Sequence, residues 1–217
     1  MKYSTVIFDL DGTLLDTIDD LADAVNHTMK MFGWPLRTRD EVMSFVGNGL
    51  RRLMELSVPE GPENPHFEEA AAEQRRFYQL NCNVKTAPYE GILPLMKRLK
   101  SDGYKLAIVS NKADEAVKEL DRIYFAGLTD VAVGESPQVR KKPWPDTVEK
   151  VMELLGSSKE ECLYVGDSEV DVLTAANAEI DCAAVSWGFR SHQQLLQAGA
   201  EVIIENTEEL YEYIRKE

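Results

Sequence analysis

Short apolar runs alternate with amphipathic helical patterns along most of this chain. The runs are rich in Val, Ile, Leu and Ala, and several end abruptly at a polar or acidic residue. We expect strands at residues 4–9, 105–109, 131–133, 162–165, 182–186 and 202–204. Between these runs, apolar residues recur at helical spacing. Strands that alternate with helices of about ten or more residues predict an α/β fold with a doubly wound parallel sheet.

One stretch departs from this alternation. From Thr17 onward the apolar residues fall on one helical face, and further helical pattern follows without a convincing strand before Pro88. A crossover between parallel strands needs only about a dozen residues and its loops. We therefore predict a helical cap domain at residues 16–88, inserted into a core domain formed by residues 1–15 and 89–217.

Acidic side chains stand at the ends of two predicted strands. Asp9 and Asp11 close the first strand, and Asp167 follows the run at 162–165 with Asp171 one helical turn later. Because the carboxyl ends of parallel strands share one edge of a sheet, we expect these acids to converge. Crowded carboxylates repel one another, and Mg²⁺ relieves the repulsion by taking oxygen ligands. Taken singly, the first pair also fits a polar turn, and the second pair also fits the first turn of a helix.

Phosphate-binding and cationic residues accompany these acids. Ser110 and Asn111 lie where the second strand turns into a helix that we expect to begin near Ala113, so their hydroxyl and backbone N–H groups could hold phosphate oxygens. The same two residues would also serve as an ordinary helix N-cap. Residues 140–143 (RKKP) add positive charge to an otherwise acidic chain. One lysine pointing into the acids would neutralise the site, and a solvated basic loop is the alternative.

The charge balance narrows the class of partner. The chain has 217 residues with 24 basic and 38 acidic side chains, so its formal net charge is −14 at pH 7. This argues against a sequence-independent grip on nucleic acid or on an anionic membrane surface. It leaves room for a small anionic substrate that is held by a local positive site.

The cysteines and apolar runs bear on the cellular compartment. Cys82, Cys162 and Cys182 are widely spaced without a CxxC pair, which favours reduced thiols over a disulfide framework or a zinc site. No apolar run approaches the roughly 18 residues that span a bilayer. Met1 and Lys2 precede the first strand without a signal sequence. We expect a cytoplasmic protein, and the oligomeric state is not readable from the sequence.

Four segments together resemble the motifs of a known family. They are residues 9–17 (DLDGTLLDT), 110–111 (SN), 142–143 (KP) and 166–171 (GDSEVD). In order and spacing they resemble the four motifs of the haloacid dehalogenase superfamily of phosphohydrolases. The resemblance covers nearly the whole chain and implies a Rossmann-like catalytic core with a small helical cap. Residues 46–49 and 187–190 look like segments of phosphoglycolate phosphatases within this superfamily.

The resemblance implies a nucleophile, an acid and a metal site. Asp9 would attack phosphorus and become an aspartyl phosphate, and Asp11 would protonate the leaving oxygen and then activate water. Mg²⁺ would bind the Asp9 carboxylate, the Asp11 backbone carbonyl and Asp167. The implied enzyme is a Mg²⁺-dependent phosphomonoesterase for a small phosphorylated metabolite such as 2-phosphoglycolate.

The same resemblance assigns the remaining motif residues. Ser110 and Asn111 would bind the phosphoryl oxygens, and Lys142 would bind phosphate and balance the charge of the site. Asp171 would support the site from outside the metal ligands. The cap would close over small substrates and supply selectivity.

Other functions stay open at this point. A phosphomutase of the same superfamily is disfavoured, because such mutases carry a histidine just after the first motif, where this chain has Asp19 and Asp20. A dehalogenase would lack the second acid, Asp11. A pyrophosphatase is compatible with the motifs. A non-enzymatic phosphoacceptor, as in signalling receiver domains, fits poorly because here two acids share one strand and a large cap intervenes.

Two local features concern the cap and one turn. Arg51 and Arg52 follow the loop at 46–49 and are candidates to contact a substrate carboxylate, although helix arginines are more often solvated. The segment at 177–180 lacks the glycine that the family often has there, so this turn must form without one.

Overall fold

The computed structural model describes residues 2–216. Contacts between residues divide the chain into two compact units. The sheet unit comprises residues 2–15 and 88–216, and the helical unit comprises residues 16–87. Each unit is described below by itself.

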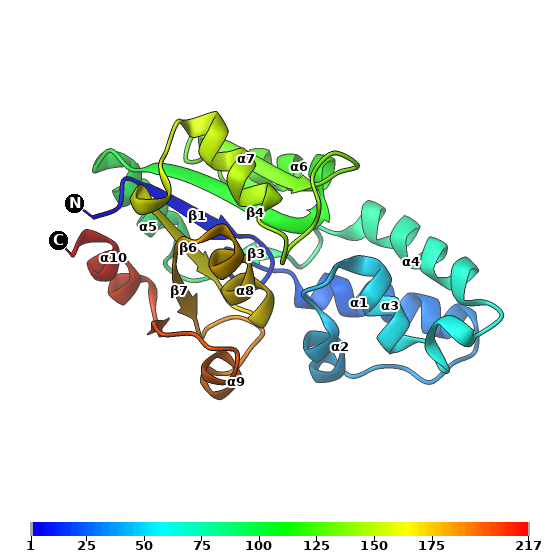
Figure 1. Ribbon diagram of the computed structural model, residues 1–217. Helices are drawn as coiled ribbons and strands as arrows, with labels where there is room; N and C mark the ends of the chain where they lie inside the picture. The colour runs from blue at the N-terminus through cyan, green and yellow to red at the C-terminus, as the bar shows by residue number, and fades with distance from the viewer. Residues whose placement is uncertain (1, 217) are drawn as a thin grey trace. The chain divides into compact units, whose positions relative to one another are not determined.

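Six parallel strands form the sheet of the sheet unit (Figure 1). Their order across the sheet is β5 (Val131–Glu135), β4 (Lys105–Ala113), β1 (Thr5–Asp9), β6 (Cys162–Gly166), β7 (Asp181–Val185) and β8 (Ile203–Ile204). In the register, Asp9 pairs with Val109 of β4 and Phe8 pairs with Val165 of β6. The carboxyl ends of these three strands are therefore adjacent. The predicted doubly wound parallel sheet is confirmed.

Helices cover both faces of this sheet. They are α5 (Ile92–Ser101), α6 (Asp114–Tyr124), α7 (Asp146–Leu155), the 3-10 turn η2 (Lys159–Glu161), α8 (Glu169–Ala178), α9 (His192–Gln197) and α10 (Thr207–Arg215). Residues of α5, α6 and α10 join a buried cluster on one face. Residues of α7 and α8 join a separate buried cluster on the other face. Both faces of β1 are thus covered, which explains its continuous apolar sequence.

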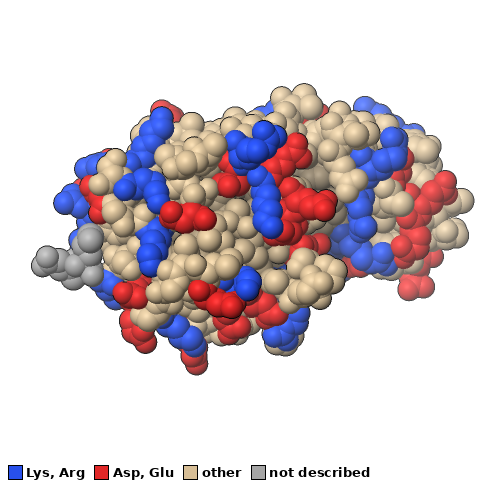
Figure 2. Space-filling view, turned by 90° about the horizontal axis from the view of Figure 1, so that it is seen from above, with Lys and Arg blue, Asp and Glu red and all other residues tan. Residues whose placement is uncertain are grey.

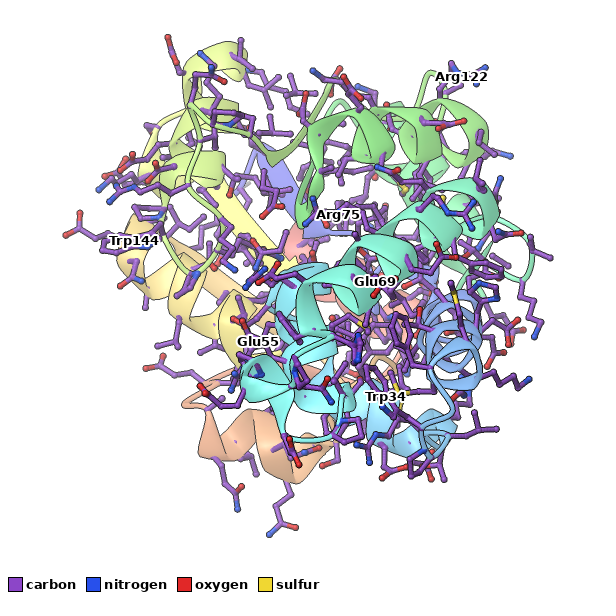
Figure 3. All side chains as sticks on the ribbon, turned by 90° about the vertical axis from the view of Figure 1, so that its right-hand side faces the viewer. Trp34, Glu55, Glu69, Arg75, Arg122 and Trp144 are labelled. Carbon is purple, nitrogen blue, oxygen red and sulfur yellow. The ribbon has the colours of Figure 1, made fainter. Side chains whose placement is uncertain are left out.

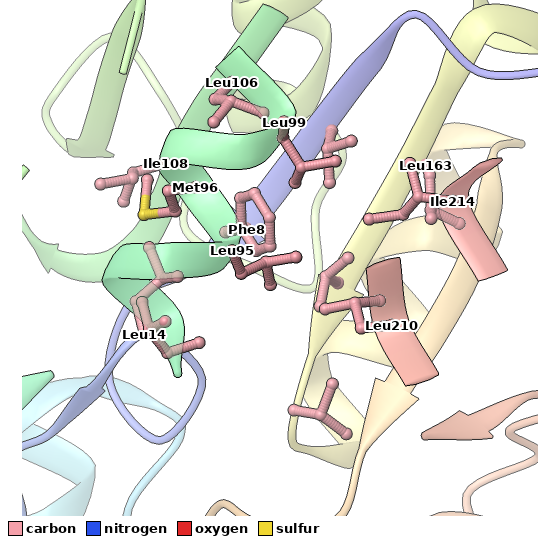
Figure 4. Close-up of a cluster of buried hydrophobic side chains, with 14 of the residues drawn as sticks. Phe8, Leu14, Leu95, Met96, Leu99, Leu106, Ile108, Leu163, Leu210 and Ile214 are labelled. Atoms are coloured by element: carbon pink, nitrogen blue, oxygen red, sulfur yellow. The ribbon is translucent and has the colours of Figure 1, made fainter. Parts of the chain in front are cut away.

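The central strand shows how the core holds the site. Val6 and Phe8 belong to one buried cluster and Ile7 to the other, as the two-residue period of a strand requires. Figure 4 shows Phe8 among leucines that include Leu95 of α5 and Leu210 of α10. This packing fixes the strand whose last residue is an aspartate.

The helical unit is built from four helices and a turn. They are α1 (Ile18–Met31), α2 (Arg39–Phe45), α3 (Gly49–Ser57), η1 (Gly61–Glu63) and α4 (Phe67–Asn81). Helix α4 packs along α1 and also contacts α3. Its buried side chains recur at helical spacing, whereas Glu69 and Arg75 are exposed on it (Figure 3).

A buried aspartate ties the end of the helical unit to its beginning. Asp20 in the first turn of α1 is 3% exposed. Its carboxylate accepts hydrogen bonds from the backbone N–H groups of Val84, Lys85 and Thr86 at 2.9–3.1 Å. The Thr86 hydroxyl adds a fourth donor at 2.8 Å. The segment after α4 is thereby held against α1.

The strand β4 is longer than predicted. It runs to Ala113, four residues beyond the expected end, and α6 begins at Asp114. Its register against β5 shifts between Val109 and Ala113, where pairing with Glu135 resumes. The start of the helix is thus close to the expected position near Ala113, but Ser110 and Asn111 lie within the strand and not at the turn into the helix. The alternative that one of them is an ordinary helix N-cap was wrong. The polar residues sit inside an irregular strand because their side chains bond to the site.

Smaller features were not predicted. Two two-residue strands, β2 (Leu15–Asp16) and β3 (Ala87–Pro88), pair with each other, and helix α9 was not singled out. At the end of α8, Glu179 takes a left-handed conformation with φ of 58°. The turn at 177–180 thus forms without glycine.

Charged side chains of both signs are interspersed on the face shown in Figure 2. Surface acids form ion pairs with neighbouring lysines and arginines, as Asp130 does with Lys100 at 2.8 Å.

Within residues 2–216, no helix combines the length and the apolar character needed to cross a membrane.

Candidate active site

A buried lysine joins two of the motif acids. The Lys142 side chain is 3% exposed, and its Nζ lies 2.6 Å from Asp9 Oδ1 and 2.7 Å from Asp171 Oδ1. It also lies 3.2 Å from the Tyr164 hydroxyl. Asp9 is the last residue of β1, and Asp171 is in the first turn of α8. Residues far apart in sequence therefore meet at the carboxyl edge of the sheet.

Asp171 is fully engaged as a hydrogen-bond acceptor. Besides Lys142, its Oδ1 accepts from the Tyr164 hydroxyl at 2.8 Å. Its Oδ2 accepts from the backbone N–H of Ser168 at 3.1 Å and from the Ser168 hydroxyl at 2.5 Å. The acidic residue here closes a capping box at the start of α8. Both alternatives at this position hold together, since the residue begins a helix and also lies in the acid cluster.

Asp167 is held from two sides. Its Oδ2 accepts from the backbone N–H of Phe189 at 2.6 Å, and its Oδ1 accepts from the Thr13 hydroxyl at 3.2 Å. Glycines make this approach possible, because a Cβ on Gly12 would lie 2.3 Å from Asp167 Oδ2. A Cβ on Gly188 would lie 2.3 Å from the Gly12 carbonyl oxygen. The loops after β1 and β7 close tightly around this carboxylate.

Three carboxylates form a group that fits a divalent cation. Asp9, Asp167 and Asp171 are all buried, and each has an oxygen within 4.8 Å of the other two. Burial, and then the charge of Asp171, raises the pKa of Asp9 well above its usual range. The same two causes raise the pKa of Asp167 to about 7. Oxygen donors at this density suit a hard cation such as Mg²⁺, which would favour the ionised forms.

The charge of Lys142 is maintained despite its burial. Burial acts to lower the pKa of this ammonium, but Asp171 and Asp9 outweigh it, so the pKa lies above its usual value. Of the basic loop, this lysine points into the acids. Arg140 instead pairs with Asp146 at 2.8 Å with a half-exposed side chain. The loop thus supplies Lys142 as a buried cation, and the solvated-loop alternative fits the exposed Arg140 and Lys141.

Among the described residues, the group of carboxylates that fits a cation does not include Asp11. Its Oδ1 accepts from Lys112 Nζ at 2.9 Å, and its Oδ2 accepts from the Ser110 hydroxyl at 3.3 Å. The expected convergence is seen for Asp9, Asp167 and Asp171, and the predicted metal contact of Asp11 through its backbone carbonyl stays a prediction. The Asp11 carboxylate is instead paired with a second lysine, Lys112.

Lys112 is a site residue that sequence reasoning missed. The available signal was strand alternation, because residues two apart in a strand share a face. Ser110 and Lys112 share one face and both reach Asp11. Asn111 lies between them and reaches the other way, to Lys142.

Asn111 holds the backbone of the lysine loop. Its Nδ2 donates to the Lys142 carbonyl at 3.1 Å, and its Oδ1 accepts from the Lys142 N–H at 2.6 Å. The side-chain amide thereby positions the segment that carries the buried ammonium. Its expected contact with phosphate stays a prediction.

The loop after β7 is a second element whose role was not predicted. Trp187 Nε1 donates to the Thr13 carbonyl at 3.0 Å. Arg190, 7% exposed, pairs with Glu169 at 2.8 Å. These contacts fasten the loop to the segment after β1 and to α8. The sequence at 187–190 (WGFR) gave no signal of these contacts.

The candidate arginines of the helical unit are engaged at its surface. Arg51 pairs with Glu68 at 2.7 Å, and Arg52 pairs with Glu55 at 2.9 Å. Both side chains are half exposed. The contacts favour the solvated alternative for these residues.

Comparisons with known proteins agree with this geometry. Residues 6–185 match the family of haloacid dehalogenase-like hydrolases. The chain is 37% identical over 185 residues to a phosphoglycolate phosphatase of Aquifex aeolicus, covering 85% of each chain. It is 30% identical over 215 residues to the pyrophosphatase PpaX of Halalkalibacterium halodurans, covering 99% of this chain and 98% of that protein.

A solved structure extends the likeness to the whole fold. The crystal structure of a candidate phosphoglycolate phosphatase from Lactobacillus delbrueckii subsp. bulgaricus matches with a TM-score of 0.95. The two chains are 38% identical, and the match covers 100% of each. The chain therefore belongs to the haloacid dehalogenase-like hydrolase family, as a phosphatase that is similar to phosphoglycolate phosphatases.

Proposed function

We propose that this protein is a Mg²⁺-dependent phosphomonoester hydrolase that acts through an aspartyl phosphate on Asp9. The observation that carries the proposal is the contact between Lys142 Nζ and Asp9 Oδ1 at 2.6 Å, inside a group of three buried carboxylates. A lysine so placed neutralises the nucleophile and still carries charge for a transferred phosphoryl group. The sheet unit would be the catalytic core, and the helical unit would be the cap.

The first step forms the covalent intermediate. A carboxylate oxygen of Asp9 attacks phosphorus, and the bond between phosphorus and the ester oxygen breaks. Asp11, as the carboxylic acid, gives its proton to that oxygen, so the leaving fragment departs as an alcohol. Ser110 and Asn111 would bind phosphoryl oxygens during the transfer.

The second step releases phosphate. Asp11, now a carboxylate, takes a proton from water as the water oxygen attacks phosphorus. The bond between phosphorus and the Asp9 oxygen breaks, which restores the Asp9 carboxylate and frees inorganic phosphate. When bound on Asp9, Asp167 and the Asp11 carbonyl, Mg²⁺ would supply positive charge to the phosphoryl oxygens. Asp171 holds Lys142 in place throughout.

The substrate we propose is a small phosphorylated metabolite, with 2-phosphoglycolate first. Similarity to phosphoglycolate phosphatases over most of the chain supports this choice. Pyrophosphate is the second candidate, because the PpaX relatives match over nearly the same length. A phosphomutase and a non-enzymatic phosphoacceptor remain as outcomes of the test. Partners other than such a substrate, and the expected cytoplasmic location, stay predictions.

The test measures phosphate release from 2-phosphoglycolate, pyrophosphate, sugar phosphates and nucleotides, with Mg²⁺ or with a chelator. We expect one compound to be hydrolysed far faster than the others, and only with metal. The Asp9→Asn variant should lose at least about a thousandfold in kcat while its fold persists, because the nucleophile is gone. If no compound is hydrolysed while an acyl phosphate still labels Asp9, a mutase or phosphoacceptor role replaces the hydrolase.

A further inference from the structure

The site contains two lysines whose side chains are largely withdrawn from solvent and have different partners. Lys142 lies between Asp9 and Asp171, whereas Lys112 lies on Asp11 at 2.9 Å. The Lys112 side chain is only 8% exposed, and that of Asp11 is 16% exposed. Withdrawing a lysine from water is costly, so its placement calls for a partner or a ligand of opposite charge.

The backbone around Lys112 is built to hold it there. Its N–H donates to the Ser110 hydroxyl at 3.1 Å. On the neighbouring strand, a Cβ on Gly134 would lie 2.6 Å from the Lys112 carbonyl oxygen. The Gly134 N–H also donates to Asp114 at 2.9 Å. The irregular end of β4 is therefore held by a hydrogen bond to Ser110 and by close packing against Gly134 of β5.

This position places Lys112 beside the leaving fragment, an inference that rests on the proposed function. In the proposed reaction, Asp11 donates a hydrogen bond to the leaving oxygen over a distance of about 3 Å. Lys112 Nζ is one further hydrogen bond away, on the same carboxylate. The atoms of the leaving fragment next to that oxygen are thus within reach of the ammonium.

The chemistry of the leaving fragment suits this ammonium. A lysine that is largely withdrawn from water is stabilised by oxyanions beside it, and an anionic group on the leaving fragment would supply one in addition to Asp11. Glycolate carries a carboxylate there, and pyrophosphate carries a second phosphate, so the two classes of relative share this chemistry.

We propose that Lys112 binds the anionic group of the leaving fragment and thereby selects substrates that carry one. Ser110 and Asp11 position it, and the ligand is an oxyanion next to the scissile bond. Lys142 serves the transferred phosphoryl group, whereas Lys112 serves the group that departs.

The test compares 2-phosphoglycolate with its uncharged amide, 2-phosphoglycolamide, on the wild type, Lys112→Met and Lys112→Arg. We expect kcat/KM of Lys112→Met to fall about 10- to 100-fold on phosphoglycolate, the value of one charge-assisted hydrogen bond. On the amide the fall should stay below about threefold, and turnover of the amide reports that the variant is folded. Lys112→Arg should recover part of the loss, because it keeps the charge.

Pyrophosphate identifies the source of the anion. A fall on pyrophosphate like that on phosphoglycolate supports an oxyanion site in general, and a fall on phosphoglycolate alone supports a carboxylate site. Lys118→Met is the matched control, because Lys118 is exposed on α6 and pairs with Asp114. It should leave both substrates unchanged.

Other outcomes overturn the inference. Equal losses on phosphoglycolate and its amide would mean that Lys112 only supports Asp11, and no loss on either would remove its role. Failure of the proposed function is seen separately, as a wild type that hydrolyses neither ester. In that case calorimetric binding to Asp9→Asn, with and without Lys112→Met, still decides whether the lysine distinguishes the acid from the amide.

Discussion

Buried aspartates occur in both units, but they are satisfied in different ways. In the helical unit, Asp20 is surrounded by four hydrogen-bond donors, three of them backbone N–H groups. In the sheet unit, Asp9, Asp167 and Asp171 crowd together around one lysine. The pKa of Asp9 is raised by its burial and then by Asp171.

The difference separates a structural carboxylate from a chemical one. Backbone donors satisfy Asp20 completely, so it stabilises the fold and offers nothing to a ligand. The crowded acids carry more negative charge than Lys142 balances, and this attracts a metal cation. The metal and Lys142 would then attract a phosphoryl group. Burial alone therefore does not distinguish a catalytic acid from a structural one. Buried carboxylates whose charge is not balanced by nearby donors or cations are the better candidates.

The largest expected effect comes from removing Lys142, which pairs with two of the crowded acids. Lys142→Met leaves Asp9 and Asp171 buried without their partner, and should lower the free energy of unfolding by about 3–5 kcal/mol. Activity should fall at least about a thousandfold. Urea unfolding and phosphate release measure the two effects.

A matched change and a second-site change sharpen that result. The neighbouring Lys141 is exposed, so Lys141→Met should change stability little. Adding Asp171→Asn to Lys142→Met should recover part of the stability, because one uncompensated charge is removed. If Lys142→Met were as stable as the wild type, Asp9 and Asp171 would not need the charge of Lys142 in order to be buried together.

The structural aspartate gives a smaller expected effect. Asp20→Asn turns an amide nitrogen toward N–H donors and weakens the remaining bonds, so the free energy of unfolding should fall by about 2–3 kcal/mol. The exposed Asp23→Asn, which loses only the surface pair with Lys85, is the control and should cost little. A loss of activity from Asp20→Asn without a loss of stability would contradict a purely structural role.

The smallest expected effect is a pH dependence of the metal-free protein. The pKa of Asp167 is raised from 3.8 to about 7 by burial and then by Asp171. Its stabilising contribution is therefore full below pH 3.8 and is lost as the pH rises toward 7. With a chelator, the wild type should lose about 1–2 kcal/mol relative to Asp167→Asn between pH 5 and 7.

Melting temperatures across that pH range measure this difference, and Mg²⁺ should abolish it by favouring the ionised carboxylate. The comparison with Asp167→Asn removes the contribution of ordinary surface acids. A wild type that gains stability over this range relative to the variant would show that Asp167 is ionised without metal.

Much of the architecture was predictable from pattern. The alternation of runs at 4–9, 105–109 and 162–165 with helical patterns predicted the parallel sheet, because a strand buried on both faces needs a continuous apolar sequence. The excess of helix after residue 17 indicated a separate helical region. Four short motifs identified the family, and they also singled out Asp9, Asp167 and Lys142.

Only the tertiary structure decided which side chains are partners. The sequence by itself determined that acids stand at strand ends, because this depends on local pattern and on the shared edge of parallel strands. It did not determine that Asp11 turns to Lys112 while Asp171 turns to Lys142, or that Asp20 accepts from the backbone N–H groups of residues 84–86. Such pairings depend on register, strand irregularity and glycine-permitted approaches between distant segments, and these exist only once the chain is folded.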